Sequence, residues 1–282
     1  MQNDTDELDI KEYLKVLKES SPYDFSDYSD NSISRRVQKV MRDFKLTYDE
    51  LVDITRKDPS FCEQIVDSLA VNTTELFRDP LLWKFLMDKI YPALKNKIHI
   101  YIWHAGCSSG QEVYSNLIML DYLNLLDRTT VYASDISRRI LDQATKGIYK
   151  YEFNKNYISN FNQVFEGKDI DFKKYITINE NEDKLIVNDF LKDKVKFSKY
   201  DLVQEEIPFY NKFDIIFCRN VLIYFNVSLQ SKIINRFYQK MFPGALLCLG
   251  IHETITGFYK TKFMKNEFVY HKNTSGFHLK QN

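Results

Sequence analysis

The turn at residues 106–112 contains the side chains of this sequence that are best suited to hold a small organic cofactor. It reads Gly-Cys-Ser-Ser-Gly-Gln-Glu, between a β-rich stretch at 99–105 and a helical pattern of apolar residues at 111–125. In open α/β sheets, ligands bind beyond the carboxyl ends of the strands, where a turn of this kind lies. The strand, glycine-rich turn and helix therefore predict a binding site for a nucleotide-like molecule.

The spacing of the glycines argues against two common ligands. A dinucleotide fingerprint requires G-x-G-x-x-G, but Ser108 and Gln111 occupy the second and third glycine positions, and no lysine follows Gly110 as a triphosphate loop requires. A nucleoside without phosphates remains, and S-adenosylmethionine fits. Glu112 could bind its amino group, and Asp135, at the end of the next predicted strand, could accept from its ribose hydroxyls. Asp135 could equally cap the following helix, so its role stays open.

Short apolar stretches predict the sheet that carries this turn. Besides 99–105, strands are expected at 130–133, 213–218 and 245–249, separated by helical or polar segments. Apolar strands that alternate with helices indicate an α/β fold with a parallel, doubly wound sheet buried on both faces. The charged, tyrosine-rich stretch at 147–196 is too long for an ordinary connection, so it predicts an inserted subdomain.

The residues before this sheet show helical patterns. Thr47 and Glu50 have the spacing of a capping box, and Asp58 and Asp79 each precede a proline, as an N-cap residue does. The first 30 residues are rich in acids and predict a solvated segment with one helix. Apolar residues then recur at spacings of four, three and four: Ile33, Val37, Val40 and Phe44. We expect a helical domain at 1–90, followed by the sheet domain at 91–282.

The composition excludes several other classes of protein. The 39 basic and 39 acidic residues give a net charge of zero, which argues against binding nucleic acid through many phosphate contacts. No apolar stretch approaches the roughly 20 residues of a membrane-spanning helix, and the acidic start is unlike a secretory signal. The four cysteines lie far apart without metal-ligand spacing, so we expect reduced thiols, no metal and a cytoplasmic location.

Four blocks of this sequence resemble those of the CheR family, the chemotaxis receptor methyltransferases, and they occur in the same order. The blocks are residues 72–79, 105–115, 133–137 and 213–225, and the resemblance runs from about Ser32 to the C-terminus. It implies a Rossmann-like methyltransferase sheet with a small β insertion, preceded by an all-α domain. It further implies transfer of a methyl group from S-adenosylmethionine to glutamate side chains of chemoreceptors, which yields glutamyl methyl esters and S-adenosylhomocysteine.

The resemblance also implies roles for individual residues. Arg78 and Tyr224 would act in catalysis, with Tyr224 near the sulfur. Arg78 would also close over the cofactor, together with two other residues before the sheet domain. The cofactor-binding residues implied in this way are Asn72, Thr74, Arg78, Gly106, Glu112, Asp135, Asp201, Leu202, Arg219 and Asn220.

Three residues depart from the family pattern. Gln111 replaces the first acid of the usual Gly-Glu-Glu, Val113 replaces a proline, and Asp201 replaces an asparagine near the adenine. Glu112 is retained. An ionised aspartate can accept a hydrogen bond from the adenine amino group, but it cannot donate one to a ring nitrogen. These departures leave an alternative open, in which the protein binds the cofactor and the receptor but has little catalytic activity.

A basic segment at 31–46 has five basic residues and one acid. Such a segment is commonly the solvated face of a helix. The family resemblance favours a second interpretation, because a cationic surface steers an acidic partner and fixes its register. The residues implied in docking the cytoplasmic helices of the receptor are Arg35, Arg36, Lys39 and Arg42. We expect the protein to act as a monomer, without nucleic acid and without insertion into the membrane.

Overall fold

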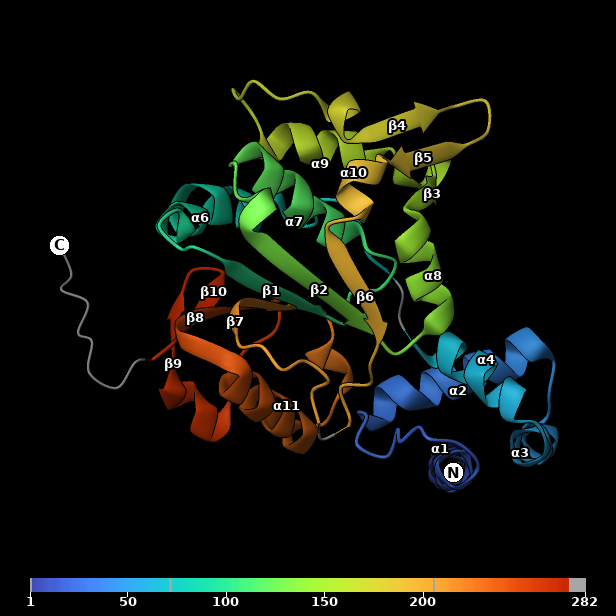
Figure 1. Cartoon of the computed structure of the whole chain (residues 1–282). Helices are drawn as coiled ribbons and strands as arrows, with labels where there is room; N and C mark the ends of the chain where they lie inside the picture. The colour runs from blue at the N-terminus through green and yellow to red at the C-terminus, as the bar shows by residue number, and fades with distance from the viewer. Residues whose placement is uncertain (1, 71–72, 205, 274–282) are drawn as a thin grey trace.

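The computed structural model describes residues 2–70, 73–204 and 206–273. A helical bundle lies beside a seven-stranded sheet, and a small three-stranded sheet lies at the opposite end of the molecule (Figure 1). None of the described helices is both long enough and apolar enough to cross a membrane.

The bundle consists of α1 (Gln2–Ser20), α2 (Asp30–Phe44), α3 (Tyr48–Lys57) and α4 (Pro59–Leu69). Its core includes Tyr13 and Leu17 of α1, both without exposed surface, so α1 is a packed helix and the expectation of a solvated segment is wrong. The predicted capping box at Thr47 starts α3, and the Asp58 side chain accepts from two backbone N–H groups of α4. Both predicted helix starts are therefore confirmed.

The large sheet has the strand order β6-β2-β1-β7-β8-β10-β9. Five strands run parallel: β6 (Val195–Lys199), β2 (Thr129–Asp135), β1 (Ile100–Ala105), β7 (Phe213–Cys218) and β8 (Met241–Leu249). β10 (Val269–Lys272) is antiparallel to β8, and β9 (Phe263–Asn266) is antiparallel to β10. The predicted α/β class with a mainly parallel sheet is confirmed.

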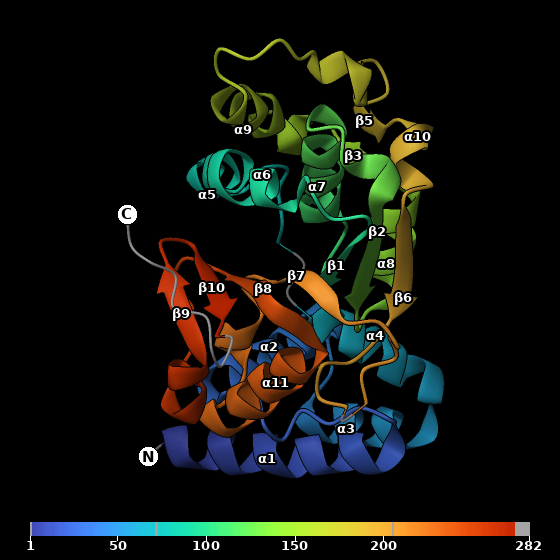
Figure 2. The ribbon, with the colours of Figure 1, turned by 60° about the vertical axis from the view of Figure 1, so that its left-hand side comes forward.

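Helices cover both faces of this sheet (Figure 2). Ile100 and Ile102 of β1 belong to the same core as α7 (Gln111–Tyr122), whereas Trp103 and Ala105 belong to the core of α11 (Val227–Lys240). α8 (Arg138–Lys146) packs against β2 and β6. This alternation of side chains explains why the strands are apolar at successive positions. Shorter helical turns are η2 (Leu126–Arg128), η5 (Leu222–Tyr224) and η6 (Gly257–Lys262).

The helices before β1 pack with the sheet rather than with the bundle. They are α5 (Pro80–Phe85), the π-helical turn η1 (Leu86–Ile90) and α6 (Tyr91–Leu94). Trp83, Leu86 and Tyr91 have no exposed surface and share a core with β1 and α7. We therefore propose that the domain boundary lies before Leu76 and not at residue 90. Asp79 is the N-cap residue of α5 with a proline following it, as predicted, but its side chain makes no capping hydrogen bond.

The insertion between α8 and β6 is built on an antiparallel sheet in the order β3-β5-β4. Its strands are β3 (Ile148–Lys150), β4 (Ile176–Asn179) and β5 (Lys184–Val187), and its helices are α9 (Asn156–Val164), α10 (Asp189–Lys192), η3 (Glu152–Asn154) and η4 (Phe172–Lys174). Tyr149 and Phe161 join the same core as α7. The insertion is thus packed on the first half of the large sheet, and residues 195 and 196 of the expected range lie in β6.

Candidate functional site

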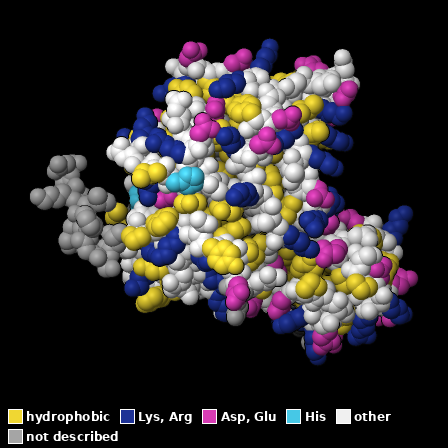
Figure 3. Space-filling model, viewed as in Figure 1, with side chains coloured by type: hydrophobic (Ala, Val, Ile, Leu, Met, Phe, Trp, Pro, Cys, Tyr) yellow, Lys and Arg dark blue, Asp and Glu magenta, His cyan; other side chains and the backbone are white. Residues whose placement is uncertain are grey.

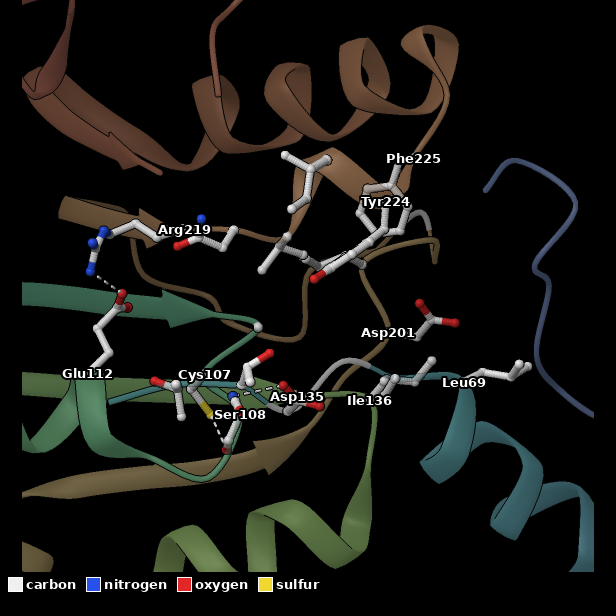
Figure 4. A pocket seen from close by; sticks show the side chains of 18 of the residues that line it. Leu69, Cys107, Ser108, Glu112, Asp135, Ile136, Asp201, Arg219, Tyr224 and Phe225 are labelled. Atoms are coloured by element: carbon white, nitrogen blue, oxygen red, sulfur yellow. Dashed lines mark hydrogen bonds and ion pairs between the residues drawn. The ribbon is translucent and has the colours of Figure 1, made fainter. Parts of the chain in front are cut away.

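A cleft opens where the carboxyl ends of β1, β2 and β7 meet the bundle (Figure 4). Its empty space is about 1090 Å³, including the part that is open to solvent. Tyr224 and all the expected cofactor-binding residues except Asn72 line it: Thr74, Arg78, Gly106, Glu112, Asp135, Asp201, Leu202, Arg219 and Asn220. Asn72 lies outside the described residues.

Glu112 is held by two partners on opposite oxygens. His104 Nδ1 lies 2.8 Å from Oε1, and Arg219 donates to Oε2 at 3.0 Å. Burial raises the pKa of Glu112, but the His104 hydrogen bond and the Arg219 charge outweigh it and hold the pKa below its usual range. Glu112 is therefore an ionised carboxylate at the edge of the cleft, where it can bind an ammonium group.

His104 is a fully buried residue that fixes the orientation of Glu112. Tyr91 donates to the Asn116 side-chain oxygen, so the Asn116 amide nitrogen faces His104 Nε2 at 2.9 Å. Nε2 must then accept, which leaves the proton on Nδ1 for donation to Glu112. The ring also stacks on Phe217, with centroids 4.5 Å apart. His104 was not predicted from the sequence, since it lies within the strand and not in the turn.

Arg219, at the end of β7, joins three segments around the cleft. Its guanidinium binds Glu112, the Asp79 carboxylate at 2.5 Å and the Arg78 carbonyl at 3.2 Å, while the side chain is 2% exposed. Asp79 is thus the N-cap residue of α5 by position, but its carboxylate forms an ion pair with Arg219 in place of a capping hydrogen bond. The Arg219 Nε atom is buried and has no hydrogen-bond partner among the described residues.

Asp135 ends β2 and faces the cleft from the opposite side to Glu112 (Figure 4). One carboxylate oxygen accepts from the Ser108 N–H at 2.9 Å, and the other accepts from the Ser137 N–H at 3.1 Å. Burial raises the pKa of Asp135, with these backbone donors opposing it. The cap of α8 is the side chain of Ser137. Asp135 therefore fixes the glycine-rich turn and retains acceptor capacity toward the cleft.

Gly106 permits a close approach between the turn and the loop after β7. Its φ is +76°, and a Cβ atom there would lie 2.6 Å from Val221 Cγ2. A side chain at this position would strain the backbone and push the loop outward. The turn and the loop can therefore bound the cleft together only because residue 106 is glycine.

The departures at 111 and 113 serve the packing of the turn. The Gln111 amide donates to the Tyr157 hydroxyl of α9 at 2.8 Å, and its oxygen accepts from Ser109 Oγ at 2.8 Å. Tyr149 of the insertion donates to the Ser109 carbonyl at 2.7 Å. Val113 has no exposed surface. Gln111 thus connects the cofactor turn to the inserted subdomain and does not compete with Glu112.

Asp201 lies in the loop after β6, next to Leu202. Its Oδ1 accepts from the Val203 N–H at 2.9 Å. Burial raises the pKa of Asp201 to about 6, although this hydrogen bond lowers it. In Figure 4, Asp135, Asp201 and Tyr224 surround the same space. Asp201 can accept a hydrogen bond from a ligand amino group when it is ionised.

The bundle supplies part of the cleft wall. Tyr28 and Arg36 both line the cleft, and the Arg36 guanidinium carbon lies 4.5 Å from the centre of the Tyr224 ring. Arg36 also donates to the Leu69 carbonyl and to Ser32 Oγ. It is therefore a residue of the cleft, although the sequence placed it with the exposed docking residues. Tyr28 was missed, because an isolated tyrosine before α2 has no pattern that indicates a ligand.

The other predicted docking residues, Arg35, Lys39 and Arg42, are exposed on α2 and do not line the cleft.

The two predicted catalytic residues both line the cleft. The Arg78 side chain donates to the Thr73 carbonyl at 3.4 Å and forms no ion pair with any described residue. Tyr224 is held from the bundle, because the Ser29 N–H donates to its carbonyl at 2.9 Å.

The residues of this cleft fit S-adenosylmethionine. Two buried polar atoms of cleft residues lack partners within the described chain, the Ser108 hydroxyl and Arg219 Nε, and both could bind polar groups of a ligand. Glu112 offers a carboxylate to an amino group, and Asp135 offers an acceptor to hydroxyl groups. Among the described residues no cluster of three or more His, Cys, Asp or Glu side chains could hold a metal ion.

Comparisons with known proteins identify both parts of the chain. The family described as "CheR methyltransferase, SAM binding domain" matches residues 72–270, and "CheR methyltransferase, all-alpha domain" matches residues 8–70. The putative methyltransferase Cher3 of Pseudomonas putida is 33% identical, over 88% of this chain and 89% of its own. The chemotaxis protein methyltransferases of Vibrio cholerae and Borreliella burgdorferi are 31% and 30% identical, over 88% of this chain and 90% and 89% of theirs.

The Asp201→Asn substitution should stabilise the protein in a pH-dependent way. The folded pKa of about 6 exceeds the ordinary 3.8, so the folded state binds more protons between these values, and stability falls as pH rises through 6. Removing the charge should therefore raise the free energy of unfolding by about 3 kcal/mol at pH 7.5 and about half of that at pH 5. Urea denaturation at both pH values measures this. The exposed control Asp142→Asn should change little, and a gain independent of pH would contradict the prediction.

Proposed function

The chain belongs to the CheR methyltransferase family, and we propose that it methylates glutamate side chains of chemotaxis receptors. It is an S-adenosylmethionine-dependent methyltransferase of chemotaxis. The observation that carries the glutamate assignment is the position of the cleft, where the cofactor-binding turn and two arginines, Arg36 and Arg78, line one space between the domains. These cations suit an acidic side chain that enters from the receptor.

We assign the binding of the donor to residues from three parts of the chain. Glu112 binds the methionine amino group, and Asp135 accepts from the ribose. Asp201 and Leu202 lie at the adenine, while Arg219 and Asn220 complete the pocket. Thr74 and Arg78 close over it from the segment between α4 and α5, and for Asn72, outside the described residues, the same role rests on the family resemblance alone. Supporting this assignment, all of these residues within the described chain line the same cleft.

The reaction requires positioning rather than a catalytic base. S-adenosylmethionine supplies a methyl group that already carries its leaving group. A glutamate with a pKa of about 4.3 is ionised at neutral pH, so its carboxylate is a competent nucleophile. Alignment of two reactants can be worth up to roughly 7–11 kcal/mol of the barrier. The chain must therefore hold the acceptor carboxylate in line with the transferred methyl group and exclude water.

Arg78 and Tyr224 are the residues that we assign to this alignment. The Arg78 guanidinium makes only one long hydrogen bond within the described chain and forms no ion pair there, so it can orient an incoming carboxylate. Such contact must be loose, because the nucleophile loses charge in the transition state and only differential binding accelerates the reaction. Tyr224 is placed by Ser29 and Arg36, both from the bundle.

The exposed face of α2 suits an acidic receptor helix. Arg35, Lys39 and Arg42 are exposed on it, and only Lys39 forms an ion pair, with Asp43 of the same helix. On the face shown in Figure 3, basic and acidic side chains are mixed over both domains. The docking charge is therefore local, in agreement with the balanced total of 39 basic and 39 acidic residues. We propose a cytoplasmic monomer that binds the cytoplasmic helices of receptors and no nucleic acid.

A second candidate is a receptor-binding module that holds the cofactor but transfers the methyl group poorly. The departure at Asp201 keeps it open, because an ionised aspartate donates no hydrogen bond to the adenine ring and could leave the donor less firmly aligned for transfer. The departure at Gln111 does not, because this side chain binds Tyr157 and leaves Glu112 in place. The two candidates differ in turnover and not in cofactor binding.

Incubation with receptor-enriched membranes and methyl-labelled S-adenosylmethionine tests the proposed activity. Label should enter the receptor and be released by base as methanol, since methyl esters of glutamate hydrolyse in this way. Membranes whose receptors carry alanine at the methylated glutamates are the matched control and should remain unlabelled. Cofactor binding without transfer would support the second candidate, and transfer to a small molecule or nucleic acid would refute both.

Replacement of Arg78 by alanine should lower kcat about 100-fold, because misplaced reactants lose alignment. Tyr224→Phe removes one hydroxyl and should lower it about fivefold. Single-turnover methylation at saturating cofactor measures both rates. The conservative variant Arg78→Lys keeps the charge and should recover only part of the rate. Wild-type single-turnover rates in Arg78→Ala and Tyr224→Phe would remove both residues from the catalytic assignment.

Reversal of charge at Arg35 and Arg42 together should raise KM for the receptor on the order of tenfold, mainly at low salt. kcat at saturating receptor should remain unchanged, since neither side chain lines the cleft. Arg36 is left intact because it contacts Tyr224. The control reverses Arg56 and Lys57 at the end of α3 and should have no effect. An unchanged receptor KM across salt concentrations would argue against docking on α2.

A further inference from the structure

A buried carboxylate outside the cleft binds four backbone N–H groups. Glu253 follows the end of β8, is 5% exposed and does not line the cleft. Its Oε2 accepts from the Asn220 N–H at 2.7 Å and the Gly250 N–H at 2.6 Å. Its Oε1 accepts from the Val221 N–H at 3.0 Å and the Ile223 N–H at 3.2 Å. Each carboxylate oxygen is thus shared by two donors.

Three of these donors belong to the loop at 219–224, which carries Arg219, Asn220 and Tyr224 into the cleft. The backbone of this loop is irregular before the short turn η5, and Asn220 has a left-handed φ of +60°. The amides of Asn220, Val221 and Ile223 bind no acceptor other than Glu253 in the described chain. The conformation of the loop therefore depends on a side chain that the cofactor does not reach.

The loop is also confined on two sides by glycines. On the Glu253 side, a Cβ atom at Gly250 would lie 2.7 Å from Glu253 Oε2, 2.9 Å from the Asn220 side-chain Nδ2 and 3.0 Å from the Asn220 backbone nitrogen. On the cleft side, a Cβ atom at Gly106 would lie 2.6 Å from Val221 Cγ2. A side chain at either position would clash with its neighbours, so the two glycines let the backbone approach the loop and Glu253 closely on both sides. The loop that Glu253 binds is therefore also the loop that packs next to the Gly106 turn.

We propose that Glu253 is a positioning residue, which holds the 219–224 loop at the distance from the Gly106 turn that cofactor binding requires. Its carboxylate is suited to this role because two equivalent oxygens can each accept two hydrogen bonds. Glutamine has the same length but only one accepting oxygen, so two of the four N–H groups would lose their acceptor. Buried donors without partners are costly, and the loop would move to satisfy them.

A purely structural role for Glu253 makes a different prediction. In that case, replacing Glu253 would lower the stability of the whole chain and the fraction of folded protein, while each folded molecule would bind the cofactor as before. Positioning instead changes the affinity of each folded molecule, because Arg219 and Asn220 shift relative to Glu112. Affinity measured on folded protein therefore separates the two roles.

Calorimetric titration of Glu253→Gln with S-adenosylhomocysteine tests this proposal at a temperature well below unfolding. The dissociation constant should rise about tenfold, with the fitted stoichiometry unchanged. Glu206→Gln, an exposed glutamate, is the matched control and should bind as the wild type does. Wild-type affinity in Glu253→Gln would overturn the proposal, as would a reduced stoichiometry at unchanged affinity.

Glu253→Asp examines whether charge alone is sufficient. It keeps the carboxylate but shortens the side chain by one methylene, so it cannot reach the loop amides and Gly250 together. Its affinity for S-adenosylhomocysteine should therefore also fall, and wild-type affinity in this variant would overturn the argument from geometry.

Hydrogen exchange of the cofactor-free wild type provides a test that needs no variant to fold. The amides of Asn220, Val221 and Ile223 should exchange slowly, because each donates to the buried carboxylate. Exchange of these three amides at the rate of unprotected amides would overturn the proposal, since the loop would then not be held by Glu253.

Discussion

The arrangement of the cleft depends on one buried guanidinium. Arg219 is 2% exposed and forms ion pairs with Glu112 of α7 and Asp79 before α5. A buried cation without partners is strongly destabilising, so the three segments must come together whenever the chain folds. Glu112 is oriented in turn by His104, whose tautomer is set by Asn116. This series of contacts places a carboxylate and a guanidinium side by side at the end of the sheet, where a zwitterionic amino-acid group can bind both.

The two domains also meet at this cleft, which links the proposed receptor-docking surface to the proposed cofactor site. Ser29 and Arg36 of the bundle hold Tyr224, and Asp27 accepts from the backbone and side chain of Asn226 in the next turn. Further along the interface, Lys199 bonds to both Tyr23 and Glu63. The helix that carries the proposed docking cations therefore contacts Tyr224, a proposed catalytic residue, and the wall of the cleft includes residues of both domains.

The departures from the family pattern have structural partners. Gln111 binds Tyr157, so a position that is acidic in the family here joins the cofactor turn to the insertion. Asp201 is buried, and burial raises its pKa to about 6 although it accepts a hydrogen bond from the Val203 N–H. The first substitution leaves Glu112 in place, and the second puts a carboxyl group with a raised pKa into the cleft wall.

Local sequence signals determined much of this protein by themselves. The capping box at Thr47, the cap at Asp58 and the apolar strands depend on neighbours a few residues away, so they can be read from the chain, as can the glycine turn that ends in Glu112. The packing of α1, the ion pair of Asp79 and the place of Arg36 in the cleft depend on partners far away in sequence. Asp79 looks like a cap because a proline follows it, yet Arg219, 140 positions later, binds its carboxylate instead. Only the tertiary structure could decide these cases. Each of these side chains has more than one possible role, and the fold determines which distant partner comes within its reach.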